Sequence, residues 1–131
     1  MTDEKSEKMK VLFVDDDELL LTQTRIFLGK SDYDFEIDIA RHVEGALQKI
    51  EDTEYDAIIS DYKMQARDGL DLLRAIRKKD EDLPFIMFTG KGNEEVAQEA
   101  LNLGADRYIR KRGDAKSQYD KLADALEDLI R

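Results

Sequence analysis

The chain has 131 residues, enough for one domain that buries about two-thirds of the surface its unfolded chain exposes. Its 31 acidic residues outnumber its 21 Lys and Arg residues, and the formal net charge of -10 argues against direct contact with nucleic acid or an anionic membrane. Cysteine is absent, so disulfides, thiolate catalysis and Cys-based zinc sites are excluded. No apolar run approaches the roughly 20 residues of a membrane span, and the chain start has no signal-peptide core, so we expect a cytoplasmic protein.

Strand-like and helix-like patterns alternate along the first half of the chain. Residues 1–9 are polar and charged, and we expect them to form a frayed lead-in. The apolar run at 10–14 predicts a strand, and apolar residues at helical spacing predict a helix over 18–29. Strict alternation at 35–39 indicates a strand with one solvated face, which is typical of a sheet edge. The next helix is expected over 43–50.

The same alternation continues in the second half. An unbroken apolar run that stops at Asp61 predicts a strand over 56–61, covered on both faces, and residues 62–69 have no clear period. We then expect a helix that ends at 77–79, a strand that Pro84 opens, and a helix from Asn93, as N-cap, to Gly104. The short mixed segment 107–110 is expected to be a second edge strand, and an apolar stripe over 119–130 to be the last helix.

Five strands alternating with five helices predict an α/β fold whose parallel strands are joined by right-handed crossovers. The three fully apolar strands belong in the middle of the sheet. With strands two and five at the edges, we expect a single flavodoxin-like domain, a doubly wound five-stranded parallel sheet of order 2-1-3-4-5.

This order brings carboxylates together at one edge. Strands one and three become neighbours, so Asp15 and Asp16 should lie close to Asp61. Carboxylates about 5 Å apart repel by roughly 3 kcal/mol per pair at an effective dielectric near 20. All-oxygen ligands of this kind suit a hard divalent cation, Mg²⁺ or Mn²⁺. An ionised carboxylate can attack phosphorus without a general base, so Asp61 is a candidate nucleophile, and Lys111 could supply a second cation.

Five ordered motifs carry a resemblance to a known family: the acidic pair after the first strand, "ISDYKM", Asp68-Gly69, "FTGKG" and "RYIRK". Together they resemble the receiver (REC) domain of two-component response regulators. The resemblance covers residues 10–130, and we expect a receiver domain over 10–131 after the lead-in of residues 1–9.

The resemblance implies roles for particular residues. Asp61 would be the phosphoacceptor, Asp16 a direct metal ligand, Asp15 a ligand through water, and Lys63 a ligand through its backbone carbonyl. Thr89 would bond the phosphoryl group, Lys111 would pair with it, and Tyr108 would be the switching aromatic. Lys63 and Lys91 would tune the dephosphorylation rate, and we expect at least one of them to lie over the phosphoryl site.

The resemblance also implies partners. A histidine kinase or a phosphotransfer protein would donate the phosphoryl group, and a downstream protein would read the surface of helix four, strand five and helix five. Dimerisation on phosphorylation is compatible with this reading. The domain would assist its own phosphorylation and dephosphorylation without being an enzyme otherwise. Whether it acts alone or belongs to a longer protein stays open.

Two positions depart from the family pattern, because Gln65 and Arg112 stand where prolines are usual. A cis peptide before a residue other than proline costs about 3 kcal/mol. We therefore expect a trans Lys111–Arg112 bond and a differently routed loop, which leaves the reach of Lys111 open.

Two other functions use related features. A haloacid-dehalogenase-like phosphatase also has a strand-end aspartate, but its second aspartate would fall at Lys63. A flavodoxin-like cofactor binder is disfavoured because the loop after the first strand is acidic, whereas a phosphate cradle offers N–H groups. The sole histidine, His42, stands at a helix start, where a capping or solvated role is favoured over catalysis.

Overall fold

The computed structural model describes residues 8–131, in which strands and helices alternate without exception. The strands are β1 (Met9–Val14), β2 (Phe35–Ala40), β3 (Ala57–Ser60), β4 (Phe85–Thr89) and β5 (Arg107–Arg110). The helices are α1 (Glu18–Gly29), α2 (Val43–Asp52), α3 (Gly69–Lys79), α4 (Glu94–Asn102) and α5 (Ala115–Ile130). No helix in this part of the chain is long and apolar enough to cross a membrane.

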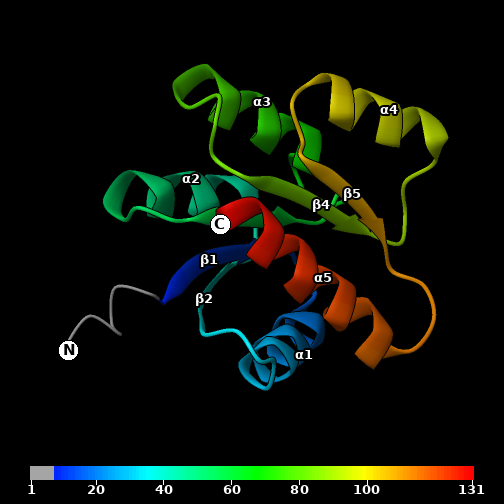
Figure 1. The fold of residues 1–131 in the computed structure, drawn as a ribbon. Helices are drawn as coiled ribbons and strands as arrows, with labels where there is room; N and C mark the ends of the chain where they lie inside the picture. The colour runs from blue at the N-terminus through cyan, green and yellow to red at the C-terminus, as the bar shows by residue number, and fades with distance from the viewer. Residues whose placement is uncertain (1–7) are drawn as a thin grey trace.

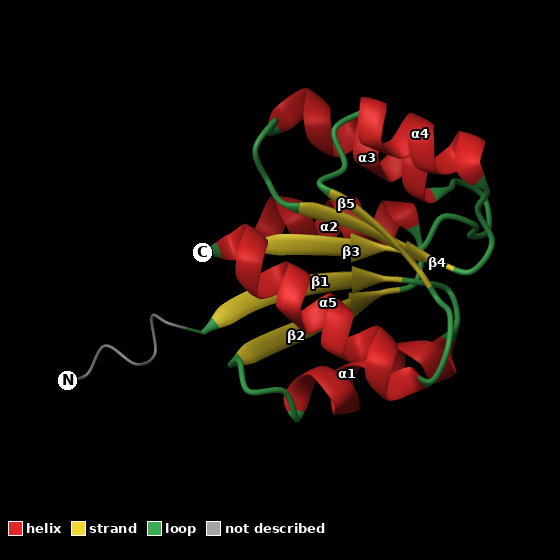
Figure 2. Ribbon diagram, turned by 45° about the vertical axis from the view of Figure 1, so that its right-hand side comes forward, coloured by secondary structure: helices red, strands yellow, loops and turns green. Residues whose placement is uncertain are grey.

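The five strands form one parallel sheet in the order β2-β1-β3-β4-β5, which confirms the predicted topology. Helices α1 and α5 lie on one side of the sheet, and α2, α3 and α4 on the other (Figures 1 and 2). Val14 pairs with Ala40 on one side and with Ser60 on the other, so the carboxyl ends of these strands stand at the same edge. Side chains that follow those ends are therefore brought together.

Each face of the sheet has its own core, because successive strand residues point to opposite faces. Phe13, Ile59 and Phe88 pack with residues of α1 and α5. Their neighbours Leu12 and Ile58 pack with residues of α2 and α3. The strands β1, β3 and β4 are thus covered on both sides, as their unbroken apolar runs predicted.

Side-chain caps begin the helices. Asn93 caps α4 as expected, accepting a hydrogen bond from the Val96 N–H at 2.9 Å. The only histidine caps α2, since His42 Nδ1 accepts from the Gly45 N–H at 3.0 Å. Asp68 caps α3 in a reciprocal capping box that the sequence reading did not anticipate.

Some element boundaries differ from the prediction. Met9 is the first residue of β1 and is buried, so the lead-in stops before it, and residues 1–7 lie outside the described residues. Strand β3 ends at Ser60, which leaves Asp61 just beyond the ladder. Helix α3 begins at Gly69, because the capping box starts the helix before its apolar period is visible.

Candidate functional site

Three carboxylates converge at the carboxyl edge of the sheet. The Asp15 N–H donates to the Ala40 carbonyl at 3.0 Å, and the Asp61 N–H donates to the Val14 carbonyl at 2.9 Å, so both residues extend the strand pairing by one step. One oxygen each from Asp15, Asp16 and Asp61 lies within 4.8 Å of the others. Asp15 is wholly buried and Asp61 is 7% exposed, whereas Asp16 is exposed. The predicted acidic cluster is therefore present.

Lys111 reaches this cluster from the end of β5. Its Nζ lies 3.0 Å from Asp15 Oδ2 and 3.7 Å from Asp61 Oδ2, and it stands 5.4 Å from the centroid of the Phe88 ring. The Lys111 N–H donates to the Thr89 carbonyl at 3.1 Å. Between residues 8 and 131 no peptide bond is cis, so the Lys111–Arg112 bond is trans as expected, and the lysine still reaches the carboxylates.

The electrostatics of the cluster are dominated by burial. Desolvation raises the pKa of Asp15, against the pull of the Lys111 ammonium and the hydrogen bond from the Asp17 N–H, and the charge of Asp61 adds to the rise. Lys111 alone thus does not compensate the negative charge buried at this edge. A further cation near Asp15, Asp16 and Asp61 would compensate it.

The backbone around Asp61 is held on several sides. Its Oδ1 accepts from the Tyr62 N–H at 2.8 Å, and its carbonyl accepts from Ser60 Oγ at 2.8 Å. Gly69 lies so close that a Cβ on it would be 2.2 Å from the Asp61 carbonyl oxygen. The glycine of the Asp68-Gly69 motif is therefore required for close backbone approach. The Ser60 contact was missed because one buried serine in a strand carries no sequence signal.

The remaining predicted residues lie at the ends of β4 and β5 and in the nearby loops. Thr89 is 1% exposed, and its Oγ1 accepts from the Lys91 N–H at 3.1 Å. Tyr108 has a buried hydroxyl, and burial raises its pKa. Lys63 and Lys91 are both exposed, and whether either lies over the site stays a prediction.

The donor set at this edge fits a hard divalent cation. All three candidate ligands are carboxylates whose oxygens already lie within 4.8 Å of one another, and oxygen donors are what Mg²⁺ and Mn²⁺ prefer. The only histidine of the chain is committed to capping α2. A softer metal would find no matching ligand here.

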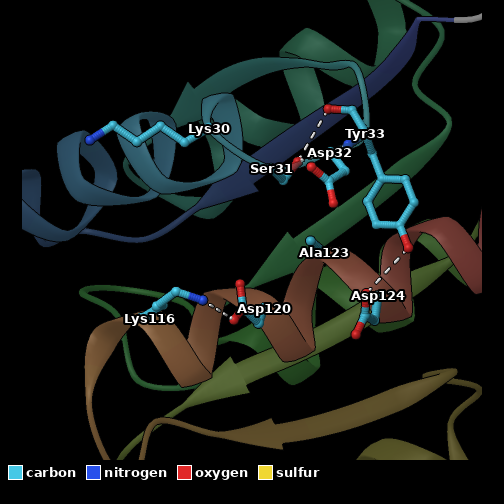
Figure 3. Close-up of a pocket in the computed structure, with 8 residues that line it drawn as sticks. All are labelled: Lys30, Ser31, Asp32, Tyr33, Lys116, Asp120, Ala123 and Asp124. Carbon is cyan, nitrogen blue, oxygen red and sulfur yellow. Dashed lines mark hydrogen bonds and ion pairs between the residues drawn. The ribbon is translucent and has the colours of Figure 1, made fainter.

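A polar cleft of about 380 Å³ lies elsewhere, between the segment after α1 and helix α5 (Figure 3). Part of its polar lining is already paired. Lys116 Nζ lies 2.8 Å from Asp120 Oδ2, and the Tyr33 hydroxyl donates to Asp124 Oδ1 at 3.3 Å. Lys30 and Asp32 also line the cleft, but the Lys30 side chain points away from Asp32 (Figure 3), so these charges do not converge as the three carboxylates of the acidic edge do.

A parallel sheet of this order, with three carboxylates and a lysine at its carboxyl edge, defines a receiver-type α/β domain. Residues 11–123 match the family described as the response regulator receiver domain, and the chain belongs to this family. The resemblance to the receiver domain that the five sequence motifs indicated is confirmed.

Relatives of known name agree with this assignment. The chain is 30% identical to the two-component response regulator PhoP of Pseudomonas aeruginosa over 123 residues, 94% of this chain and 52% of that protein. It is 33% identical to the chemotaxis protein CheY of Halobacterium salinarum over 120 residues, 89% of this chain and 96% of that one. It thus spans about half the length of the first relative and nearly all of the second.

A solved structure agrees in fold. The response regulator TrrA of Thermotoga maritima, in complex with Mg(2+)-BeF, is 28% identical, with a TM-score of 0.80 over 92% of this chain and 98% of that chain. The flavodoxin-like fold predicted from the strand order is therefore confirmed.

Proposed function

We propose that this receiver domain takes a phosphoryl group from the histidine of a kinase or phosphotransfer protein onto Asp61. The observation that carries the proposal is the arrangement of Asp61 itself. Its Oδ1 is engaged by the Tyr62 N–H, while Oδ2 stands 3.7 Å from Lys111 Nζ, beyond hydrogen-bond length. One oxygen is thus oriented, and the other remains free to attack phosphorus.

The transfer needs positioning and charge neutralisation more than acid–base catalysis. As the bond from Asp61 Oδ2 to phosphorus forms, the bond from phosphorus to the donor's imidazole nitrogen breaks, and the imidazole leaves with that electron pair. Lys111 pairs with the oxygens of the incoming group. A bound Mg²⁺ or Mn²⁺, held by Asp15, Asp16, Asp61 and the Lys63 carbonyl, would neutralise further charge on those oxygens.

Phosphorylation would then be read on the surface formed by α4, β5 and α5. The phosphoryl group carries about two negative charges in place of the single charge of the Asp61 carboxylate, and the Thr89 hydroxyl would turn from its contact with the Lys91 N–H to bond it. Tyr108 would follow by changing its burial. A downstream protein, or a second copy of the domain, would recognise the changed surface.

The alternative of a small-molecule phosphatase is weaker. Such an enzyme needs an acid/base carboxylate two residues after the nucleophile, where this chain has Lys63. We therefore propose a signalling domain that turns over no other substrate.

The deciding experiment is labelling with acetyl phosphate. Wild type should take up phosphate only with Mg²⁺, and Asp61→Asn should take up none, because the amide cannot act as nucleophile. Asp82→Asn, which removes the same charge in the exposed loop before β4, is the matched control and should label like wild type. Uptake by Asp61→Asn, or turnover of a phosphate ester such as p-nitrophenyl phosphate, would overturn the proposal.

The two loop lysines need a separate test. Lys63→Ala/Lys91→Ala should label on Asp61 but lose phosphate at a changed rate, because an ammonium group near the phosphoryl oxygens alters the approach of water. A double variant with the wild-type rate would remove both lysines from the proposed roles.

A further inference from the structure

The hydroxyl of Tyr108 is buried in an unfavourable way. Tyr108 pairs with Met87 in the sheet, and its ring packs against the core that α2, α3 and α4 cover. Among the described residues, its hydroxyl is the one buried side-chain polar atom without a hydrogen-bond partner. A buried hydroxyl without a partner costs free energy, so some feature of the fold must make room for it and hold it there.

That room is provided by Gly92, in the loop between β4 and α4. A Cβ on Gly92 would lie 1.9 Å from the Tyr108 hydroxyl oxygen, 3.2 Å from Tyr108 Cζ and 3.4 Å from Val96 Cγ1. The first distance is far inside van der Waals contact, so any larger residue would push the hydroxyl away.

Backbone conformation does not explain this glycine. Within residues 8–131 the glycines in the left-handed region are Gly104 and Gly113, so Gly92 adopts a backbone that other residues can also take. What glycine alone offers at this position is the absent side chain.

We propose that Gly92 is the positioning residue that admits the Tyr108 hydroxyl beneath the loop between β4 and α4. The same loop follows Thr89, the last residue of β4, whose Oγ1 accepts from the N–H of Lys91, one residue before Gly92. Movement of Thr89 therefore reaches Gly92 through a continuous stretch of backbone. This coupling to phosphorylation rests on the proposed function, whereas the steric role of Gly92 does not.

Because the hydroxyl has no hydrogen-bond partner within residues 8–131, its buried position is only weakly favoured over a solvated one. Nothing in the described part of the chain bonds the hydroxyl inside, so water outside competes for it. The packing of the Tyr108 ring and the space left at Gly92 keep the hydroxyl beneath the loop between β4 and α4. A change of loop position of a few tenths of an ångström would alter this balance, because a close contact is steeply repulsive.

The first test is Gly92→Ala in protein labelled with 3-fluorotyrosine. The Tyr108 ¹⁹F signal is identified by its absence from Tyr108→Phe, and its exposure is measured by broadening with a soluble gadolinium chelate. In wild type this signal should be protected, and in Gly92→Ala it should become broadened. Gly90→Ala is the matched control in the same loop, since a Cβ there would meet nothing closer than Lys111 Cβ at 3.6 Å, and it should leave the signal protected.

The second test is a double-mutant cycle on the midpoint of urea unfolding. Gly92→Ala should lower the midpoint in wild type and lower it less in the Tyr108→Phe background, because the colliding oxygen is gone and the remaining 3.2 Å contact is milder. Equal losses in the two backgrounds, or a protected Tyr108 signal in Gly92→Ala, would overturn the role of Gly92.

The tests also separate this inference from the proposed function. Gly92→Ala should still label on Asp61 with acetyl phosphate, since Gly92 carries no group that contacts the carboxylates. Beryllofluoride with Mg²⁺ should then shift the Tyr108 signal in wild type and leave it exposed in Gly92→Ala. If the Tyr108 signal is exposed in Gly92→Ala but the wild-type protein takes up no phosphate, the steric role of Gly92 is upheld and the proposed phosphoryl site is rejected.

Discussion

Lys111 lies between Asp15 and Asp61 at the carboxyl edge of the sheet, and Arg77 lies between the Gly104 carbonyl and Asp106 at the amino edge. Both are long cationic side chains that are largely removed from water, with side-chain exposures of 18% and 12%. The partners they meet differ. Lys111 faces carboxylates, while Arg77 faces mostly backbone carbonyls.

At the amino edge all three nitrogens of the Arg77 guanidinium have partners. Arg77 Nε and Nη2 donate to the Gly104 carbonyl at 3.2 and 2.8 Å, and Nη1 donates to the Asp80 carbonyl at 2.9 Å. Asp106 Oδ2 accepts from the Phe85 N–H at 2.9 Å and lies 3.4 Å from Arg77 Nη2. The cluster joins the end of α3 to the starts of β4 and β5, and so it acts on stability.

At the carboxyl edge the charges do not balance. Three carboxylates share one lysine, and burial raises the pKa of Asp15 in spite of that lysine. The excess negative charge lowers the stability of the free domain and provides a place for a cation. The amino-edge cluster thus stabilises the fold, whereas the carboxyl-edge cluster, at some cost in stability, holds the groups that we propose take part in phosphoryl transfer.

The largest expected effect comes from removing the amino-edge cation. Arg77→Ala should lower the free energy of unfolding by about 3 kcal/mol, because the partly buried Gly104 carbonyl loses two charged donors and the Asp80 carbonyl loses a third. Urea unfolding measures this loss. Labelling on Asp61 should continue under conditions in which the variant is folded.

Arg74→Ala is the matched control on the same helix. Arg74 pairs with Asp71 and Glu99, but its side chain is 45% exposed. Exposed ion pairs contribute about 0.2–1 kcal/mol. If Arg74→Ala cost as much as Arg77→Ala, burial and backbone acceptors would not be what distinguishes the amino-edge cluster.

Mg²⁺ should act on the other cluster with an effect of similar size. At about one hundred times its dissociation constant, a ligand that binds only the folded state adds about 2.7 kcal/mol to the free energy of unfolding. We expect this gain in wild type and in Arg77→Ala, and little of it in Asp16→Asn, which loses one of the three carboxylates. EDTA should reverse it. A full gain in Asp16→Asn would show that Mg²⁺ binds elsewhere.

The two clusters also differ in how far sequence reasoning could foresee them. Asp15, Asp16 and Asp61 each follow an apolar strand, so strand order alone predicts that they meet. Lys111 follows the last strand in the same way. Arg77 is one of three consecutive cations at the end of α3, and nothing local in the sequence distinguishes it or shows that the carbonyls of Asp80 and Gly104 fold back to it.

The same limit applies to other contacts. The buried hydrogen bond of 2.8 Å between the hydroxyls of Thr24 and Tyr119 joins residues 95 positions apart. The close approach of Gly69 to Asp61 depends on the path of a loop without periodicity. Periodicity predicts which elements form and in what order, whereas such contacts depend on where backbone atoms lie after packing.

A smaller effect is expected from neutralising one carboxylate without added metal. Asp15→Asn should raise the urea midpoint at neutral pH, because burial raises the pKa of Asp15 and so the charged form weakens the folded state. The asparagine Oδ1 can still accept from the Asp17 N–H, as Asp15 Oδ1 does at 2.9 Å. With Mg²⁺ the order of stabilities should reverse, since the variant has lost a ligand. A lower midpoint without metal would mean that the ion pair with Lys111 outweighs burial.

The smallest effect concerns Asp114, an exposed carboxylate that caps α5 outside both clusters. Hydrogen bonds from the Ser117 N–H at 3.1 Å and the Ser117 hydroxyl at 3.0 Å hold the pKa of Asp114 below its ordinary value of 3.8. A carboxyl whose folded-state pKa is lowered stabilises the fold above its unfolded pKa, and this contribution is lost as the pH falls through the folded value. Asp114→Asn should therefore be slightly less stable than wild type at neutral pH, because the amide offers one acceptor oxygen where the carboxylate offers two.

The pH dependence identifies the source of that difference. Urea midpoints of wild type and Asp114→Asn should converge as the pH is lowered from neutral through the folded-state pKa of Asp114, because below it the carboxyl is protonated in both the folded and the unfolded state. A gap that stays constant over this range would show that the charge of Asp114 contributes nothing and that hydrogen-bond geometry alone sets the cap. Because Asp114 is exposed, added salt should also narrow the gap, whereas the bonds of the largely buried Arg77 side chain to the Gly104 carbonyl should respond little to salt.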